Sequence, residues 1–178
     1  MSRLTPLCID LDGTLIEEDV TLEAVKIYIR RNLFNLIIVL AWMIRGRAYF
    51  KHKIAQHVDL DVKSLSYRKK LLAFIRKKKE KEHKIFLATA CNQAYANSIS
   101  DYLGIFDGVF ASTKRENLRA RAKAQALVKS FGKNGFSYAG NSDDDIFVWR
   151  ESVECILVAP TKSVIKKMQG CKYLLFEK

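Results

Sequence analysis

The sequence predicts an α/β protein with a Rossmann-like, doubly wound parallel sheet and an inserted all-helical unit. One short apolar run that suits a strand lies in residues 1–19, and further such runs alternate with helical patterns in residues 84–178. Residues 20–83 show helical spacing alone, with no proline and a single glycine, Gly46. We therefore expect residues 1–19 and 84–178 to form the core and residues 20–83 to form a helical cap.

Strand-like and helix-like segments alternate throughout the predicted core. Apolar runs predict strands at residues 6–11, 84–89, 106–112, 136–140, 154–160 and 173–176. Helical spacing predicts helices at residues 92–104, 116–132 and 162–169, with a short helix between the fourth and fifth strands. Gly104 and Gly132 mark the ends of the first two helices, because glycine readily adopts the conformation that terminates a helix.

The predicted cap contains one unusually apolar stretch. Residues 22–58 indicate two or more helices with a break near Gly46, and residues 66–84 indicate another. Residues 36–44 are continuously apolar and are flanked by basic residues. A helix of this length is much shorter than the roughly 30 Å hydrocarbon core of a bilayer. Two interpretations remain open: a helix buried within the cap, or an apolar surface for a lipid-bearing substrate or the membrane interface.

Composition and cysteine placement favour a globular protein in a reducing compartment. The chain has 178 residues, of which 49% are hydrophobic, so it can bury one good core. Its N-terminus lacks the apolar stretch of a secretory signal. The four cysteines are scattered and show no metal-ligand spacing: Cys8, Cys91, Cys155 and Cys171. We expect a cytoplasmic protein, with peripheral attachment to the inner face of the membrane as an alternative.

The net charge of +12 is the strongest global anomaly. Much of it lies in residues 68–84, a segment rich in lysine and arginine. Such a surface attracts anions, including nucleic acid, an acidic membrane leaflet or a phosphorylated substrate. The alternative is a solvated helix face that only keeps the protein soluble.

Polar side chains follow three of the predicted strands. Asp10 and Asp12 come at the end of the first strand, Thr89 ends the second, and Asn141 and Asp145 follow the strand at 136–140. Ligands bind outside the carboxyl ends of strands in parallel α/β sheets, so these side chains should meet. One carboxylate can attack phosphorus, and a second can protonate the leaving oxygen and later activate water.

The same residues predict a magnesium site. Attack of a carboxylate on a phosphate suffers charge repulsion, which a cation bound by hard oxygens relieves. Asp10, Asn141 and Asp145 supply such oxygens, and the main-chain carbonyl of Asp12 adds another. The Thr89 hydroxyl and a lysine ammonium could hold the remaining phosphoryl oxygens.

The motifs DLDGT, LAT and GNSDDD, with a lysine-bearing helix before the last, resemble those of the haloacid dehalogenase-like phosphohydrolases in order. The resemblance covers essentially the whole chain and puts residues 20–83 in the place of that superfamily's C1 cap. The stretches PLCIDLDGTL, RGRAYFK, NLRARAKAQALV and YAGNSDDDIFVWR look like the soluble domain that precedes UbiA-like prenyltransferases in some bacterial fusion proteins.

The superfamily resemblance implies a Mg²⁺-dependent phosphatase and assigns roles to the strand-end residues. Asp10 would be the nucleophile and Asp12 the general acid and base. Thr14 would help set the turn and, with Thr89, belong to the phosphate-binding residues. Asn141 and Asp145 would complete the metal site begun by Asp10 and Asp12.

Two positions depart from the family's pattern. Asn141 stands where the superfamily often has aspartate. The asparagine keeps an oxygen ligand but lacks the negative charge of the aspartate. The basic phosphate-binding residue of the third motif is ambiguous, because Lys123 and Arg119 lie one helical turn apart. An arginine could bind phosphate but is a poorer point charge for a crowded site.

Three functions are consistent with these observations. The first is a phosphatase that acts on a phosphorylated small molecule, or on a lipid-linked or other anionic substrate. The second is a catalytically weak or inactive docking domain that binds an acidic membrane or a prenyltransferase. The third is a nucleic-acid 3′-phosphatase. The sequence shows no basic groove interleaved with aromatic residues, which argues against this function.

Overall fold

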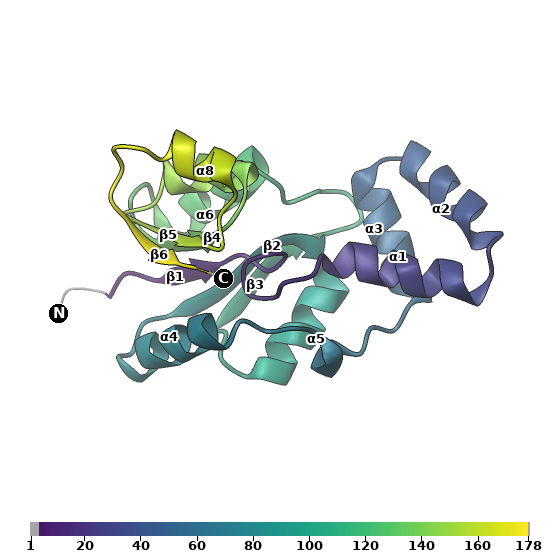
Figure 1. The fold of residues 1–178 in the computed structure, drawn as a ribbon, viewed down its shortest axis with the longest axis horizontal. Coiled ribbons are helices and arrows are strands. Elements are labelled where there is room, and N and C mark those ends of the chain that lie inside the picture. Colours follow the sequence, from purple (N-terminus) through teal and green to yellow (C-terminus); the bar gives the residue numbers. More distant parts are fainter. Residues whose placement is uncertain (1–3, 178) are drawn as a thin grey trace.

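Six parallel strands form one sheet at the centre of the molecule (Figure 1). The computed structural model describes residues 4–177. The strands lie in the order β3-β2-β1-β4-β5-β6, with every neighbouring pair parallel. Their bounds are β1 Leu7–Ile9, β2 Ile85–Asn92, β3 Gly108–Ser112, β4 Ser137–Gly140, β5 Glu154–Val158 and β6 Tyr173–Phe176. The predicted Rossmann-like parallel sheet is confirmed.

Helices pack on both faces of this sheet and extend beyond one end of it (Figure 1). Their bounds are α1 Val20–Arg31, α2 Asn35–Ile44, α3 Arg47–His57, α4 Lys69–Glu80, α5 Gln93–Leu103, α6 Arg121–Phe131, α7 Ile146–Trp149 and α8 Lys162–Lys167. Two short 3₁₀ helices, η1 Val62–Ser64 and η2 Asp143–Asp145, complete the described elements.

Strand β1 is buried on both faces. Leu7 and Ile9 belong to an apolar cluster that includes side chains of α4 and α5, whereas Cys8 belongs to a second cluster with side chains of α6, α7 and α8. All three side chains are at most 1% exposed. Because successive side chains of a strand point to opposite faces, a short continuous apolar run is what a doubly covered strand requires.

Helices α1, α2 and α3 form a unit that projects from one end of the sheet (Figure 1). Aromatic packing holds them together: the Trp42 ring of α2 lies 5.4 Å from the Tyr28 ring of α1 and 4.9 Å from the His57 ring of α3. The Tyr95 hydroxyl of α5 donates a 2.8 Å hydrogen bond to the carbonyl of Val58, just after α3. This bond connects the projecting unit to the helices that cover the sheet.

Helix α4 lies within the range predicted for the cap, but its contacts are with the core. Leu71 and Ile75 are buried in the cluster that contains β1 and β2 side chains. The Phe74 ring lies 5.3 Å from the ring of Phe176 on β6. The division at residue 83 stays a prediction, and these contacts favour an earlier end of the cap, in the connection between α3 and α4.

The predicted start of the helix at residue 116 is wrong, because α6 begins at Arg121. The Ser112 hydroxyl at the end of β3 accepts a 2.9 Å hydrogen bond from the main-chain N–H of Leu118, which keeps this segment folded back on the strand. Ala120, directly before the helix, has a φ of 50°. A positive φ in a non-glycine residue is incompatible with an α-helix, so the helical pattern starts earlier than the helix does.

Asp107 joins α4, β2 and β3 at the edge of the sheet. Its carboxylate accepts hydrogen bonds from Lys79 Nζ at 2.7 Å, Lys84 Nζ at 3.1 Å and the main-chain N–H of Ile85 at 2.8 Å. Burial acts against ionisation of Asp107, but these hydrogen bonds outweigh it and lower the pKa of the carboxyl group. The ionised form is therefore the one that stabilises the fold.

We predict that Asp107→Ala lowers the free energy of unfolding at neutral pH by about 1–2 kcal/mol, because the Ile85 N–H loses its partner. A lowered folded-state pKa gives stability that is present above the unfolded-state pKa of about 4 and is lost as the pH falls through the folded-state value. Urea unfolding of both chains between neutral pH and about pH 3 measures this. Asp101→Ala on the exposed surface of α5 is the control, and a stability difference that stays constant down to the lowest pH would contradict the linkage.

Candidate active site

A cavity of about 360 Å³ opens at the carboxyl ends of β1, β2 and β4. It lies at the edge of the sheet where the sequence predicts the site, with Lys51 of α3 on its wall. The lining residues are Asp10, Asp12, Gly13, Glu17, Glu18, Asp19, Lys51, Ala90, Arg119, Ala120, Lys123, Asn141, Ser142, Asp144 and Asp145. The structure thus brings together six of the eight predicted site residues on one surface.

The turn after β1 approaches the loop after β4 closely at Gly13. Gly13 has a φ of 73°, a conformation that glycine adopts without strain. A Cβ atom at this position would lie 2.2 Å from the Asn141 side-chain nitrogen, closer than any real contact. The positive φ therefore favours glycine at this turn, and the absence of a Cβ atom leaves the space that the Asn141 amide occupies.

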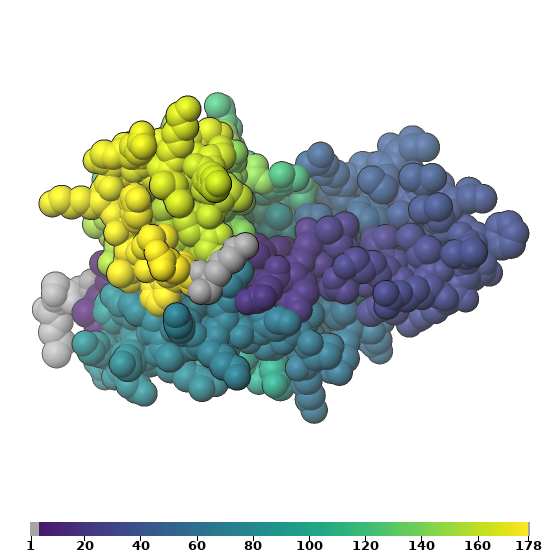
Figure 2. Space-filling model, in the orientation of Figure 1, coloured from purple at the N-terminus to yellow at the C-terminus, as the bar shows by residue number. Residues whose placement is uncertain are grey.

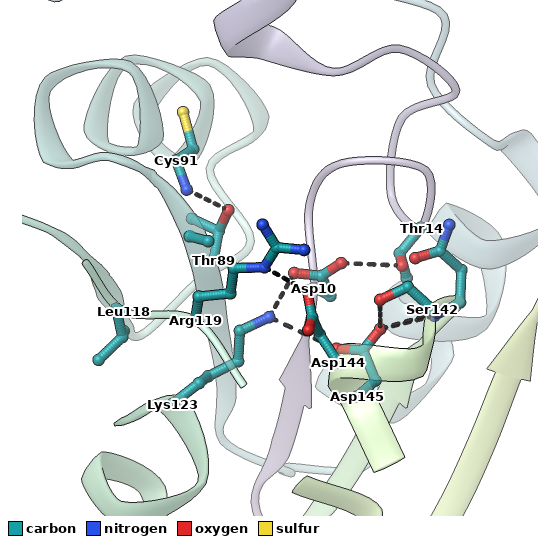
Figure 3. Close-up of polar contacts among 12 residues, drawn as sticks. Asp10, Thr14, Thr89, Cys91, Leu118, Arg119, Lys123, Ser142, Asp144 and Asp145 are labelled. Atoms are coloured by element: carbon teal, nitrogen blue, oxygen red, sulfur yellow. Dashed lines mark hydrogen bonds and ion pairs between the residues drawn. The ribbon is translucent and has the colours of Figure 1, made fainter. Parts of the chain in front are cut away.

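A buried network of charged groups connects β1, α6 and the loop after β4 (Figure 3). Lys123 Nζ donates to Asp10 Oδ1 at 2.7 Å and to the Tyr138 hydroxyl at 2.8 Å, and it lies 3.5 Å from Asp145 Oδ1. The Tyr138 hydroxyl in turn donates to Asp145 Oδ1 at 2.7 Å. Thr14 Oγ1 donates to the other oxygen of Asp10 at 3.1 Å. The Asp10 carboxylate is thereby held in one orientation.

The buried groups shift one another's pKa values. Burial raises the pKa of Asp10 to about 6, although the Lys123 ammonium acts in the opposite direction. Burial also acts to neutralise Lys123, but the charges of Asp10 and Asp145 outweigh it and raise the pKa of the ammonium. For Asp145, the effect of burial is outweighed by Lys123 and by hydrogen bonds from Tyr138 and the loop, which lower its pKa. Lys123 is therefore a permanent cation between two carboxylates.

Asp12 has different surroundings from Asp10. Its Oδ1 accepts a 2.8 Å hydrogen bond from the main-chain N–H of Val20, at the first turn of α1. Burial raises the pKa of Asp12 to about 7, the neighbouring Asp19 carboxylate adds to the rise, and the Val20 bond partly offsets it. A carboxyl group with a pKa near neutrality can both donate and accept a proton at neutral pH, as a general acid and base must.

Comparison with known proteins gives one curated relative and many structural neighbours. No family model matches the chain. An uncharacterised protein of Sinorhizobium fredii, y4nM, is 34% identical over 164 residues, which is 88% of this chain. The chain spans 30% of the length of that relative.

Three solved structures illustrate the similarity of fold. A protein of unknown function from Bordetella pertussis matches 99% of both chains, with a TM-score of 0.77 and 13% identity. A substrate-bound phosphoserine phosphatase matches all of this chain and 95% of its own, with a TM-score of 0.68 and 16% identity. A haloacid dehalogenase-like family hydrolase from Streptococcus pneumoniae matches 98% of this chain and 95% of its own, with a TM-score of 0.63 and 14% identity.

The chain has the haloacid dehalogenase-like fold. The fold predicted from the DLDGT, LAT and GNSDDD motifs is thereby confirmed, and the strands that carry these motifs lie next to one another in the sheet.

In this haloacid dehalogenase-like core, Thr14 and Thr89 lie behind the cavity rather than on its wall. Both side chains are fully buried. The Thr14 hydroxyl is bonded to Asp10, and the Thr89 hydroxyl accepts a 2.9 Å hydrogen bond from the main-chain N–H of Cys91. These bonds fix the strand ends, and the predicted binding of phosphate by the two hydroxyls stays a prediction.

The two basic candidates of the third motif lie in different surroundings (Figure 3). The Lys123 side chain is 4% exposed and contacts Asp10, whereas the Arg119 side chain is 47% exposed and pairs with Asp144. Arg119 precedes the first residue of α6 and lines the mouth of the cavity. The geometry favours Lys123 as the cation beside Asp10 and leaves Arg119 at the entrance.

Several residues of the site were not predicted from the sequence, and among these are two that make hydrogen bonds within it or beside it. Tyr138 is one of them: it lies in the middle of β4, where an aromatic residue reads as ordinary core, and only its partners show its role. Lys51 is the other: it ends the stretch RGRAYFK on α3, far in sequence from the strand-end motifs, and it donates hydrogen bonds to the carbonyl of Ala90 and, at 3.3 Å, to Asn117 Oδ1. No spacing in the sequence connects either residue to the strand ends.

The oxygen donors at the cavity fit a hard cation. Among residues 4–177, no three histidine, cysteine, aspartate or glutamate side chains are grouped as a metal site. The carboxylate of Asp10 and the amide of Asn141 nevertheless face the same cavity beside Asp12, and oxygen ligands are those that Mg²⁺ prefers. Asp145 Oδ2 already accepts three hydrogen bonds, each 3.0 Å long, from Asn141 and Ser142, so a metal bond to this oxygen would have to replace one of them.

We predict that Tyr138→Phe lowers the free energy of unfolding by about 1–3 kcal/mol and leaves the fold intact. The phenyl ring keeps the packing, but Lys123 loses an acceptor and Asp145 loses a donor, both in the interior. Urea unfolding followed by circular dichroism measures the change. Tyr173→Phe is the matched control, because that tyrosine is 36% exposed and its hydroxyl makes no hydrogen bond within residues 4–177. Equal effects of the two substitutions would contradict the role of the Tyr138 hydroxyl.

Proposed function

We propose that this chain hydrolyses phosphomonoesters, in the presence of Mg²⁺, through an aspartyl-phosphate formed on Asp10. The observation that carries the proposal is the buried Lys123 ammonium, bonded to Asp10 beside a cavity that Asp12 also lines. The similarity in fold to solved structures titled phosphoserine phosphatase and phosphoglycolate phosphatase supports this class of reaction.

The first step is attack on phosphorus by a carboxylate oxygen of Asp10. An oxygen–phosphorus bond forms, the bond from phosphorus to the ester oxygen breaks, and Asp12 gives its proton to the departing alkoxide. Thr14 and Lys123 hold the two Asp10 oxygens, which reduces the loss of freedom that attack requires.

The second step is hydrolysis of the aspartyl-phosphate. Asp12, now ionised, takes a proton from water as the water oxygen attacks phosphorus. The bond from phosphorus to Asp10 breaks, inorganic phosphate forms, and Asp12 is again protonated. A pKa of about 7 suits Asp12 for both halves of this cycle.

Positive charge has to balance the phosphate and the carboxylates. Lys123 supplies one such charge. Because Lys123 is buried, its attraction to a phosphate is stronger than that of a lysine in water. Mg²⁺, held by Asp10, the Asp12 carbonyl and Asn141, would supply further positive charge beside the phosphoryl oxygens. We assign Asp145 to the orientation of Lys123 and of the loop after β4, since both of its oxygens accept hydrogen bonds there.

The entrance of the cavity carries two cations that can contact an anionic substrate, although Arg119 pairs with Asp144 and the carboxylates of Glu17, Glu18 and Asp19 also line the cavity. Lys51 lies on one side, and the guanidinium of Arg119 lies on another. We propose a phosphorylated small molecule or a lipid-linked phosphate as the substrate. We also propose a prenyltransferase as a partner of this chain, because the sequence resemblance suggests one.

We predict metal-dependent release of p-nitrophenol from p-nitrophenyl phosphate. Chelation should abolish turnover and added Mg²⁺ should restore it. Asp10→Asn should lower kcat by about a thousandfold or more, because the amide cannot attack phosphorus. The control is Asp101→Asn on the surface of α5, which should leave kcat unchanged. Absence of turnover here and on a panel of natural phosphate esters would contradict the phosphatase and favour the docking domain.

A second prediction concerns the missing charge at position 141. Asn141→Asp should lower the Mg²⁺ concentration for half-maximal activity by about tenfold, because a carboxylate binds a divalent cation more strongly than an amide. The measurement is a Mg²⁺ titration of turnover for both chains. Asn97→Asp on the exposed surface of α5 controls for added negative charge. An unchanged or increased requirement for Mg²⁺ would remove residue 141 from the metal site.

A further inference from the structure

Helix α2 exposes large apolar side chains to solvent, which is unusual for a helix of a globular protein. Together with the turn before the helix, six of them are more than half exposed: Leu33 and Phe34 in the turn, and Ile37, Leu40, Met43 and Ile44 on the helix. We call these six side chains the apolar face. Only Val39 of this helix is buried, and Trp42 packs inward on the rings of α1 and α3. The interpretation of residues 36–44 as a helix buried within the cap is therefore wrong.

The apolar face is continuous along the helix. Ile37, Leu40 and Ile44 are spaced by three and four residues, which puts them on one side of α2, and Leu33 lies in the turn directly before the helix. The exposed fraction reaches 80% at Leu33 and 88% at Ile44, at the two ends of the face. Contiguous exposed apolar surface of this kind marks a site that something else covers.

Arginines flank both ends of the apolar face along the chain. Arg30 and Arg31 end α1 before the face, and Arg45 follows α2 and Arg47 begins α3 after it. All four arginines are exposed. The chain has no aspartate or glutamate between Glu23 and Asp59. A partner that covers this face must therefore be apolar in the middle and anionic around it.

An anionic lipid interface meets both conditions. Acyl chains would accept the apolar face, and lipid phosphates would pair with the arginines, at about 1 kcal/mol for each basic residue near the surface. A second copy of the chain on this face would instead bring two sets of flanking arginines together, which the repulsion of like charges opposes. No helix within residues 4–177 is long and apolar enough to cross a membrane, so the helix would lie in the plane of the interface.

We propose that α2 docks the chain on membranes that contain anionic lipid. The apolar face enters the headgroup boundary, and Arg30, Arg31, Arg45 and Arg47 contact lipid phosphates. Figures 1 and 2 show α2 at the outer edge of the cap. In this position α2 can lie on a membrane surface while the sheet and α8 stay away from it. Helix α3 follows α2 directly and carries Lys51 into the catalytic cavity, so docking brings the entrance of that cavity close to the membrane.

Co-sedimentation with vesicles tests the proposal. Binding should be at least tenfold stronger to vesicles of phosphatidylcholine with about 30% phosphatidylglycerol than to phosphatidylcholine alone, and should weaken when salt rises from about 0.1 to 0.5 M. The triple substitution Ile37→Ser, Leu40→Ser, Ile44→Ser should lower binding at least tenfold. Because these side chains are exposed, the thermal unfolding midpoint should not fall, which separates lost docking from lost folding.

Matched controls decide between surfaces. Leu22→Ser with Val153→Ser removes exposed apolar side chains elsewhere and should leave binding unchanged. Lys69→Glu with Lys70→Glu on α4 changes the net charge as much as Arg45→Glu with Arg47→Glu, but only the arginine pair should lower binding more than fivefold. The reverse order would place the attraction on α4 and overturn the proposal.

Two further results would also overturn it. One is binding that does not depend on phosphatidylglycerol or on the apolar face. The other is a dimer in sedimentation equilibrium that the triple substitution dissociates, since a second copy would then cover α2. Neither measurement depends on catalysis, so the result stands whether or not the chain hydrolyses phosphate esters.

Discussion

The burial of Lys123 between two carboxylates is the constraint on which the rest of the site depends. Removing an ammonium and two carboxylates from water is unfavourable unless each charge has close partners. Here Lys123 meets Asp10 and the Tyr138 hydroxyl, and that hydroxyl meets Asp145. The three charges come from β1, α6 and the loop after β4, so their compensation holds these elements at fixed distances. The buried cluster thus holds these elements together and also determines the charges at the cavity.

The loop after β1 and the loop after β4 also approach each other closely, which keeps the charged side chains within contact distance. Gly13 leaves room for the Asn141 amide, and at Gly140 an added Cβ would lie 2.6 Å from the Asp145 carboxyl carbon. Each glycine lets a main chain come near an oxygen-bearing side chain. Side chains of fixed length can therefore converge on one small cavity instead of reaching across a wide one.

Much of this could be predicted from the sequence, for reasons that particular residues make clear. Asp10 and Asp12 end a buried apolar run, and a parallel sheet brings such ends together, so the location of the site follows from patterning. The choice between Lys123 and Arg119 could not be made, because residues four apart share one helical face and the true start of α6 depends on the turn at Ala120. Tyr138 gave no signal, since its hydroxyl matters only through partners from other segments.

The cap illustrates a different limit. Its helices could be predicted from spacing, but whether α2 is buried depends on how α1 and α3 pack, and an apolar run reads the same in both cases. Helix α4 likewise carries the charge of a surface helix, yet Leu71 and Ile75 attach it to the core. Exposure is a property of the assembled molecule, so periodicity alone does not determine it.

The strand order has a consequence for how the chain is made. Strand β1 is synthesised first but lies between β2 and β4, so one of its edges stays unpaired until residues 137–140 have been added. Its apolar side chains also lack part of their cover until α6 and α7 exist. A nascent chain therefore carries an unpaired edge of β1 until β4 has been added, and the sheet is complete only after β5 and β6 have followed. Premature termination before β4 would yield a fragment with the first motif intact and an exposed edge prone to aggregation.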